Sequence, residues 1–264
     1  MQTQDASSGW DEQISQMFLD YGRYFVPERE RQVQIVVDLV PPLDQPFTVV
    51  ELCCGEGLLA QALLERWPTC TVQGLDGSPE MLRRAQERLA PYGGRFQAKL
   101  FDLAEKSWRK AEPPVHAVVS SLSIHHLEGP QKQTLFCDVY HMLARGGVFV
   151  IADLVEPAHP RGRDLSARAW DEAVRARSLE IDGHPAAFHF FERERWNTYR
   201  YLDPEDIDKP SRLFDQLSGW SWRAWSTLTY TGCAQVTSSL AAGSRTTTHR
   251  VVSTLDTWTR RLYD

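Results

Sequence analysis

The residues best placed for chemistry lie in a glycine-bearing turn that follows a short apolar run, Phe47 to Leu52. Glu51 stands near the end of this run, and Gly55 and Gly57 come directly after it. Glycines after a buried strand let a ligand approach the backbone, because no side chains intervene. Asp76 follows Gly57 by 19 residues, and a carboxylate at that place can accept hydrogen bonds from both hydroxyls of a ribose. This spacing indicates a pocket for a nucleoside-bearing ligand.

The elements that must position these residues alternate between strand and helix. Short apolar runs predict the strands, and apolar residues at helical spacing predict the helices. Strands are expected at 47–52, 71–75, 96–101, 115–122 and 148–154, with helices at 58–67, 78–89 and 131–143. This alternation is typical of a doubly wound α/β sheet, whose ligands bind outside the carboxyl ends of the strands. Asp102, which follows the third strand, is expected at that edge.

The chain divides into four segments. The first carries two predicted helices, with a break between Tyr21 and Pro27, and the second holds the sheet. The third opens with a Pro-flanked stretch and has charged helices predicted at 162–182 and 203–217, around residues rich in aromatic side chains. We expect this third segment to form a helical cover, in which most of the aromatic side chains build a small core. The segments are 1–46, 47–156, 157–216 and 217–264.

The first turn lacks the complete Gly-x-Gly-x-x-Gly pattern, which disfavours a nicotinamide-dependent oxidoreductase. From about 47 to 156 the chain instead resembles the class I S-adenosylmethionine-dependent methyltransferases, whose first turn reads acidic-x-Gly-x-Gly-x-Gly. Cys53 stands where that pattern has its first Gly. The resemblance implies a Rossmann-like doubly wound sheet. It rests on five motifs in the right order: Glu51 to Gly57, Gly74 to Met81, Phe101 to Leu103, Val118 to Leu127 and Leu143 to Val148.

The resemblance also implies which residues bind each part of S-adenosylmethionine. The methionine part would lie against the first turn, the ribose against the end of the second strand, and the adenine against the residues after the third strand. The implied residues are Tyr24, Glu51, Gly55 and Gly57 for the methionine part; Asp76 for the ribose; Asp102 and the backbone of Leu103 for the adenine; Ser120 or Ser121 near the sulfonium; and Cys53, Cys54, Gly77 and Met81 beside them.

His125 and His126 form a pair after the fourth strand. An imidazole there could act as a general base or contact the substrate, but the interpretation we favour is that the pair fills the loop without titrating. Methyl transfer needs in-line approach of a nucleophile to a sulfonium, and positioning supplies much of the acceleration. A base is therefore required only when the acceptor is a weak nucleophile. Candidate acceptor contacts in the cover are Trp196, Tyr199 and Arg212.

Composition excludes several other classes of protein. The 264 residues include 29 Lys and Arg against 35 Asp and Glu, which argues against a strong non-specific nucleic-acid binder. Five cysteines without a Cys-x-x-Cys pair support neither a disulfide framework nor a zinc ribbon. His184, His189 and Glu192 fit no standard ligand spacing, so no metal site is expected. The absence of a leader pattern and of a long apolar run predicts a cytoplasmic protein without a membrane partner.

The fourth segment, 217–264, differs in composition from the rest of the chain. It holds five Arg and two Asp but no Lys or Glu, and 17 of its 48 residues are Ser or Thr. In the family that the chain resembles, the sheet ends with a helix and a strand pair, and that signature stops after Leu217. With permitted codons, a shifted reading frame across Gly219 to Ser244 can encode a Leu-Ala-Gly helix end and two strands. We therefore expect an altered or missing strand pair, from a frameshift or from a divergent tail.

Together these features predict an enzyme that uses S-adenosylmethionine to methylate a small-molecule acceptor at an oxygen or nitrogen, with carbon as a third choice. A tRNA-modifying methyltransferase and a non-catalytic S-adenosylmethionine-binding protein are the alternatives. The sequence specifies neither the acceptor nor the oligomeric state.

Overall fold

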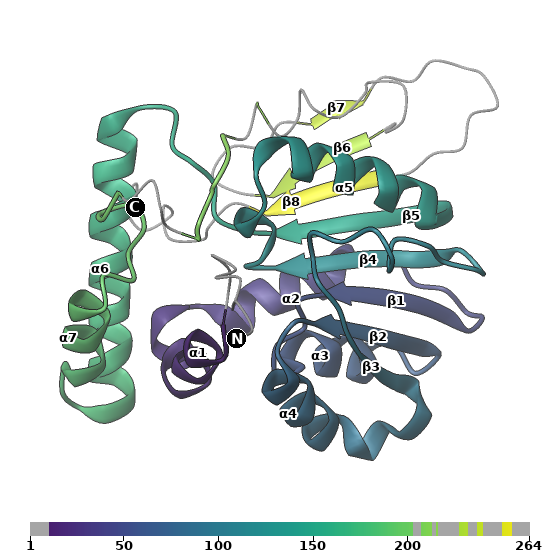
Figure 1. The fold of residues 1–264 in the computed structure, drawn as a ribbon, viewed down its shortest axis with the longest axis horizontal. Helices are drawn as coiled ribbons and strands as arrows, with labels where there is room; N and C mark the ends of the chain where they lie inside the picture. Colours follow the sequence, from purple (N-terminus) through teal and green to yellow (C-terminus); the bar gives the residue numbers. More distant parts are fainter. Residues whose placement is uncertain are drawn as a thin grey trace, which may run out of the picture.

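A computed structural model describes residues 11–202, 207–212, 215, 227–231, 237–239 and 250–254. In the last three ranges it describes the path of the backbone alone. The described strands form one sheet in the order β3-β2-β1-β4-β5-β8-β6-β7 (Figure 1). The bounds are β1 Phe47–Leu52, β2 Cys70–Asp76, β3 Phe96–Leu100, β4 Val115–Ser121, β5 Leu143–Ala152, β6 Thr227–Thr231, β7 Thr237–Ser239 and β8 Arg250–Thr254.

Strands β1 to β5 are all parallel to their neighbours, and the strand order reverses between β1 and β4. Alternate residues of the strands face opposite layers of helices, because successive side chains of a strand point to opposite faces. Val49 and Val150 pack with helices α2, Arg29–Leu39, and α3, Leu58–Arg66. Val50 and Phe149 pack with helix α5, Gly129–Met142. The sheet is therefore buried on both faces, as the predicted doubly wound fold requires.

The helices of the cover lie beyond the carboxyl ends of the strands, toward which the arrowheads of β4 and β5 point (Figure 1). Helices α1, Glu12–Phe25, α6, Pro160–Asp182, and α7, Ala186–Arg193, share a third apolar cluster. Trp170 of α6 donates from Nε1 to the carbonyl oxygen of Phe25 at 2.8 Å. Because Phe25 and Phe191 are fully buried in this cluster, the cover is packed onto α1 and forms a fixed wall.

The remaining short elements connect the sheet to its helices. Helix α4, Pro79–Leu89, begins at the N-cap Ser78, whose hydroxyl accepts from the amide of Met81 at 3.1 Å. A Ser N-cap followed by Pro is a strong helix start. The 3-10 helix η1, Ala90–Arg95, leads into β3, and the 3-10 helix η2, Ile124–His126, follows β4.

Several elements differ from the sequence-based expectation in their bounds. Strand β5 begins at Leu143, five residues before the predicted 148. Helix α1 continues to Phe25, so the first break covers only the end of the predicted stretch from Tyr21 to Pro27. A helix is predicted at 203–217, but residues 207–212 are not helical, and Ser211 forms an isolated bridge with Val155. Most other residues of the predicted helix lie outside the described residues. Local spacing did not reveal this, because the segment is held by contacts with distant residues.

The tail extends the sheet beyond β5. Strand β8 lies between β5 and β6 and is parallel to both, and β7 pairs antiparallel with β6. In the resembled family the last strand runs antiparallel between its two neighbours, so the strand pair is altered here. Among the described helices, none has both the length and the apolar character needed to cross a membrane.

Candidate active site

A cavity of about 1450 Å³ lies at the carboxyl edge of the sheet, between the strands and the cover. Its wall includes the first turn, the ends of β2 and β4, helix α1, and residues 207–209. Topological switch points such as the one between β1 and β4 are the usual place for a ligand in this type of sheet. Of the residues implied by sequence, it is lined by Cys53, Cys54, Gly55, Asp76, Gly77, Met81, Asp102, Leu103, Ser121, His125, His126 and Trp196.

The first turn is shaped by backbone in the left-handed region. Cys53, Gly55 and Gly57 have φ values of 52°, 53° and 84°. Cys53 keeps the conformation that a Gly would adopt easily, at a cost of roughly 1 kcal/mol or more for a residue with a side chain. A side chain at Gly57 would place its Cβ 2.9 Å from Cδ1 of Leu89. Gly55 and Gly57 thus adopt the left-handed backbone that favours glycine, and Cys53 adopts it despite its side chain.

Asp76 is buried at the end of β2 and is fixed by the backbone around it. Its Oδ2 accepts from the amide of Gly55 at 2.8 Å, and its Oδ1 accepts from the amide of Ser78 at 2.9 Å. Burial raises the pKa of Asp76, while these amide donors act in the opposite direction. The carboxylate is thus held in one orientation against the cavity. Asp102 is exposed, and its Oδ1 accepts from the amide of Ala104 at 2.7 Å.

Glu51 lies beneath the turn, outside the cavity lining, and is 2% exposed. Its Oε2 has no hydrogen-bond partner among the described residues. Burial raises the pKa of Glu51 to about 8, although the positive charge of Arg29 opposes the shift. A buried carboxylate oxygen without a donor is unusual in a folded protein.

Arg29 is a residue that the sequence analysis missed. It stands at the start of α2, lines the cavity, and donates from Nη1 to the hydroxyl of Ser121 and to Oε1 of Gln32. Ser121 itself donates to Oε1 of Gln32 at 3.1 Å. The only sequence signal for this pair is the i, i+3 spacing of Arg29 and Gln32, which places both side chains on one face of the helix before the first strand.

The two histidines meet carboxylates from two other segments. His125 Nδ1 hydrogen-bonds Oδ1 of Asp153, and its backbone amide donates to Oδ2 of the same residue at 3.0 Å. Its Nε2 lies 3.3 Å from Oδ1 of Asp208, and Nδ1 of His126 lies 3.4 Å from the same oxygen. Burial alone would lower the pKa of His125, but the two carboxylates outweigh burial and raise it to about 10. Asp153 and Asp208 were not predicted as site residues.

The remaining predicted residues lie away from the cavity. Ser120 is buried and its hydroxyl bonds that of Ser123 at 2.7 Å. Tyr199 is buried and donates to the carbonyl oxygen of Val155 at 3.1 Å, and Arg212 is exposed. None of these three residues lines the cavity. Of the acceptor contacts predicted in the cover, Trp196 does, and its ring stacks on that of Phe18 with ring centroids 6.4 Å apart.

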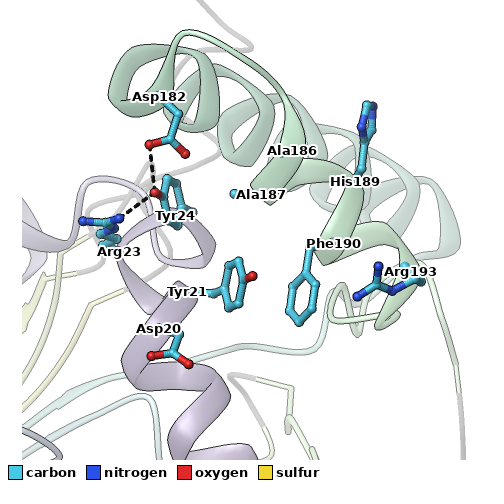
Figure 2. A pocket seen from close by; sticks show the side chains of 10 residues that line it. All are labelled: Asp20, Tyr21, Arg23, Tyr24, Asp182, Ala186, Ala187, His189, Phe190 and Arg193. Atoms are coloured by element: carbon cyan, nitrogen blue, oxygen red, sulfur yellow. Dashed lines mark hydrogen bonds between the residues drawn. The ribbon is translucent and has the colours of Figure 1, made fainter.

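Tyr24 lies in a second pocket, of about 690 Å³, between α1 and the end of α6. Its hydroxyl donates to Oδ1 of Asp182 at 3.1 Å and accepts from Nη2 of Arg23 at 2.7 Å, as Figure 2 shows. This pocket opens among Tyr21, Phe190 and their neighbours (Figure 2), and its lining includes no residue of the first turn. Tyr24 therefore ties α1 to the cover in the described structure.

Part of the chain is similar in sequence to known methyltransferases. Residues 49–147 match the family model described as a methyltransferase domain. The chain is 35% identical over 153 residues to trans-aconitate 2-methyltransferase of Azoarcus sp. (strain BH72), which covers 57% of this chain and 54% of that protein. It is 31% identical over 137 residues to the trans-aconitate 2-methyltransferase of Streptomyces coelicolor, covering 50% and 44%. The chain thus spans about half the length of the curated relatives it matches.

Solved structures agree on the fold. Phosphoethanolamine N-methyltransferase 2 of Haemonchus contortus, solved with S-adenosylhomocysteine, superposes with a TM-score of 0.54 at 16% identity, over 72% of this chain and 55% of that one. A cyclopropane synthase of Mycobacterium tuberculosis superposes with a TM-score of 0.50 at 12% identity, over 72% and 58%. These likenesses concern the fold alone. The sheet order and the first turn agree with the family match, so residues 49–147 match a methyltransferase domain in sequence and have the Rossmann-like fold of the class I methyltransferases.

Proposed function

We propose that this chain is a methyltransferase that uses S-adenosylmethionine to methylate a carboxylate oxygen of a small acid. One observation carries the proposal: a single cavity brings the first turn, Asp76 and Asp102 together with Arg195 and Lys209 from the cover. The first group suits the cofactor, and the second offers cations to an anionic acceptor.

The residues around the first turn fit S-adenosylmethionine. The two oxygens of Asp76 are oriented by backbone amides toward a cavity wide enough for a ribose. The unpartnered Oε2 of Glu51 would receive a donor from the ammonium group of the methionine part. Arg29, which faces Ser121 beside the same turn, would bind the methionine carboxylate. When bound, the cofactor supplies an electrophilic methyl group on a sulfonium.

A carboxylate acceptor agrees with the state of His125. Both of its ring nitrogens face carboxylate oxygens, of Asp153 and Asp208, so the ring is not placed to remove a proton from a hydroxyl. A carboxylate is already ionised at neutral pH and needs no base. The work of the chain is then to exclude water and to orient the acceptor in line with the sulfonium. The relatives named trans-aconitate 2-methyltransferase support a small polycarboxylate as the acceptor class.

Two measurements test the proposal. Isothermal titration calorimetry should show binding of S-adenosylhomocysteine and none of NAD. Labelled S-adenosylmethionine should then transfer methyl groups to trans-aconitate, and not to a phenol or an amine of similar size. Binding of S-adenosylhomocysteine without transfer to any acid would leave a cofactor-binding protein without this activity.

A further inference from the structure

The histidine pair and Asp208 bring three metal-ligating atoms together at the wall of the cavity. One ligand atom from each of His125, His126 and Asp208 lies within 4.8 Å of the other two. Oδ1 of Asp208 is 3.3 Å from Nε2 of His125 and 3.4 Å from Nδ1 of His126. Ligand atoms bound to one ion at about 2.0–2.2 Å in tetrahedral geometry lie roughly 3.3–3.6 Å apart, so these separations need little adjustment.

We propose that His125, His126 and Asp208 bind a divalent first-row transition metal ion. Two imidazole nitrogens and one carboxylate oxygen suit Zn²⁺, Co²⁺ or Fe²⁺ better than Mg²⁺ or Ca²⁺, which prefer oxygen ligands. The sequence gives no hint of this set by spacing, because Asp208 is 82 residues from His126.

Asp153 holds the ring of His125 in the orientation that such a site needs. A metal-ligating histidine almost always donates its other ring N–H to a carboxylate or carbonyl, which fixes the tautomer and the ring orientation. Here Nδ1 of His125 pairs with Oδ1 of Asp153, and both residues have side chains less than 10% exposed. The amides of His125 and Leu154 donate to the same carboxylate at 3.0 and 2.8 Å. Nε2 of His125 is thereby aimed at Asp208.

Residues 207–212 are anchored firmly enough to supply a ligand. The amide of Lys209 donates to the carbonyl oxygen of His125 at 2.7 Å, directly across from Asp208. Nζ of the buried Lys132 donates to the carbonyl oxygen of Lys209 and to the hydroxyl of Ser211 at 2.7 Å. The amide of Glu156 donates to the carbonyl oxygen of Ser211 at 3.1 Å. Helix α5 and the segment after β5 therefore both hold Asp208 in place.

A metal ion at this point would take the place of the Nε2 proton of His125, because a ligating imidazole is neutral. Asp153 and Asp208 bring two carboxylates to one imidazole pair, and the ammonium of Lys132 is directed at Lys209 and Ser211. All three proposed ligands line the cavity, so the open coordination positions would face it. Metal binding itself does not depend on the proposed function. Only the role of the open coordination positions rests on the proposed function, since these positions would receive an anionic oxygen of the acceptor.

The test uses the full-length chain without a histidine tag, treated with a chelator and titrated with Co²⁺. We expect about one ion per chain, with visible absorption of the kind given by low-symmetry Co²⁺ sites, and displacement of Co²⁺ by Zn²⁺. Asp208→Ala and His126→Ala should each abolish this spectrum, while Asp153→Asn should weaken the affinity about 10–100-fold. The matched controls Asp44→Ala and His141→Ala, at exposed positions, should bind as the parent chain does.

Thermal unfolding of each variant tests whether it is folded. We expect both ligand variants to fold, because the side chains of His126 and Asp208 are partly exposed. Absence of Co²⁺ binding by the parent chain would overturn the proposal. Binding that survives in folded Asp208→Ala and His126→Ala would also overturn it, because the ion would then be held elsewhere, for example by the exposed Cys137. Calorimetry with S-adenosylhomocysteine separates this failure from a failure of the proposed function.

Discussion

The backbone amide of Gly55 donates to Oδ2 of Asp76 at 2.8 Å. This bond joins the turn after β1 to the end of β2, so the two parts of the expected cofactor site hold each other in place. The second oxygen of Asp76 accepts from Ser78, the N-cap of α4. One carboxylate therefore fixes the turn, the ribose site and the start of a helix.

Replacing this carboxylate should affect both binding and stability. Asp76→Ala leaves two backbone amides without an acceptor and removes the oxygens offered to a ribose. We expect the Kd for S-adenosylhomocysteine to rise by at least about tenfold, because a hydrogen bond to a charged group contributes roughly 1.5–3 kcal/mol. Calorimetry measures this change, with the exposed Asp44→Ala as control. An unchanged Kd would remove Asp76 from the cofactor site.

Much of this site could be predicted from local sequence, because its geometry is local. The first turn, Asp76 and Asp102 each lie at or just after the end of a strand, and parallel strands bring their carboxyl ends to one edge. The predicted bounds of these strands differ from the observed bounds by only a few residues, because a short Val-rich run bounded by turn residues is a strong strand signal.

The rest of the site depends on contacts between distant segments, which spacing does not show. Asp208 reaches His125 only because Lys132 and Val155 hold residues 207–211 against the sheet. Arg29 and Ser121 are 92 residues apart in the chain, and only the fold brings them together. Tyr24 and Tyr199 are aromatic residues with a polar end, and both were predicted as ligand contacts. In the structure the hydroxyl of Tyr24 donates to Asp182 in the cover, and the hydroxyl of Tyr199 donates to the carbonyl oxygen of Val155.

Arg29 should bind the amino-acid part of the cofactor specifically. We expect Arg29→Ala to weaken binding of S-adenosylhomocysteine by about tenfold or more, the usual loss for a charge-assisted hydrogen bond. Binding of methylthioadenosine, which lacks the amino-acid part, should change much less. Arg31→Ala, an exposed arginine on the same helix, serves as the control. An equal loss for both ligands would indicate that Arg29 supports the fold of the cavity instead.

Glu51 should make stability depend on pH. Its pKa rises from 4.5 to about 8 on folding, so between these values the folded chain binds more protons at this site than the unfolded chain. Stability contributed by this group is therefore present at low pH and is lost as pH rises through about 8, by at most roughly 1.4 kcal/mol per pH unit.

Urea unfolding of the parent chain and of Glu51→Gln at about pH 5 and about pH 9 measures this effect, because the glutamine does not titrate. Relative to the parent, Glu51→Gln should gain stability as pH rises. Other titrating groups cancel in the difference between the two proteins. A difference that stays constant over this range would show that Glu51 titrates normally in the folded chain.

Gly57 should tolerate no side chain. At φ 84° its Cβ would meet Cδ1 of Leu89 at 2.9 Å and Cβ of Ala85 at 3.3 Å. We expect Gly57→Ala to lower the free energy of unfolding by about 1–3 kcal/mol through backbone strain and crowding. Gly94→Ala, where no atom lies within 4 Å of the new Cβ, should change it by less than about 0.5 kcal/mol. Equal effects of the two substitutions would mean that the turn adapts to a side chain.

The tail offers a prediction about the gene as well as the protein. If residues 217–264 are read out of frame, the underlying codons encode a helix end and two strands that the sheet would use in place of β6, β7 and β8. Restoring that frame should raise the Tm by at least a few degrees, because the expected strand pair would bury apolar surface, whereas 17 of the 48 residues of the present tail are Ser or Thr. The DNA sequence comes first: codons that do not encode those strands exclude a frameshift. Should the codons fit, an equal Tm for the two proteins would show that β8 and its neighbours support the sheet as well as the expected strand pair does.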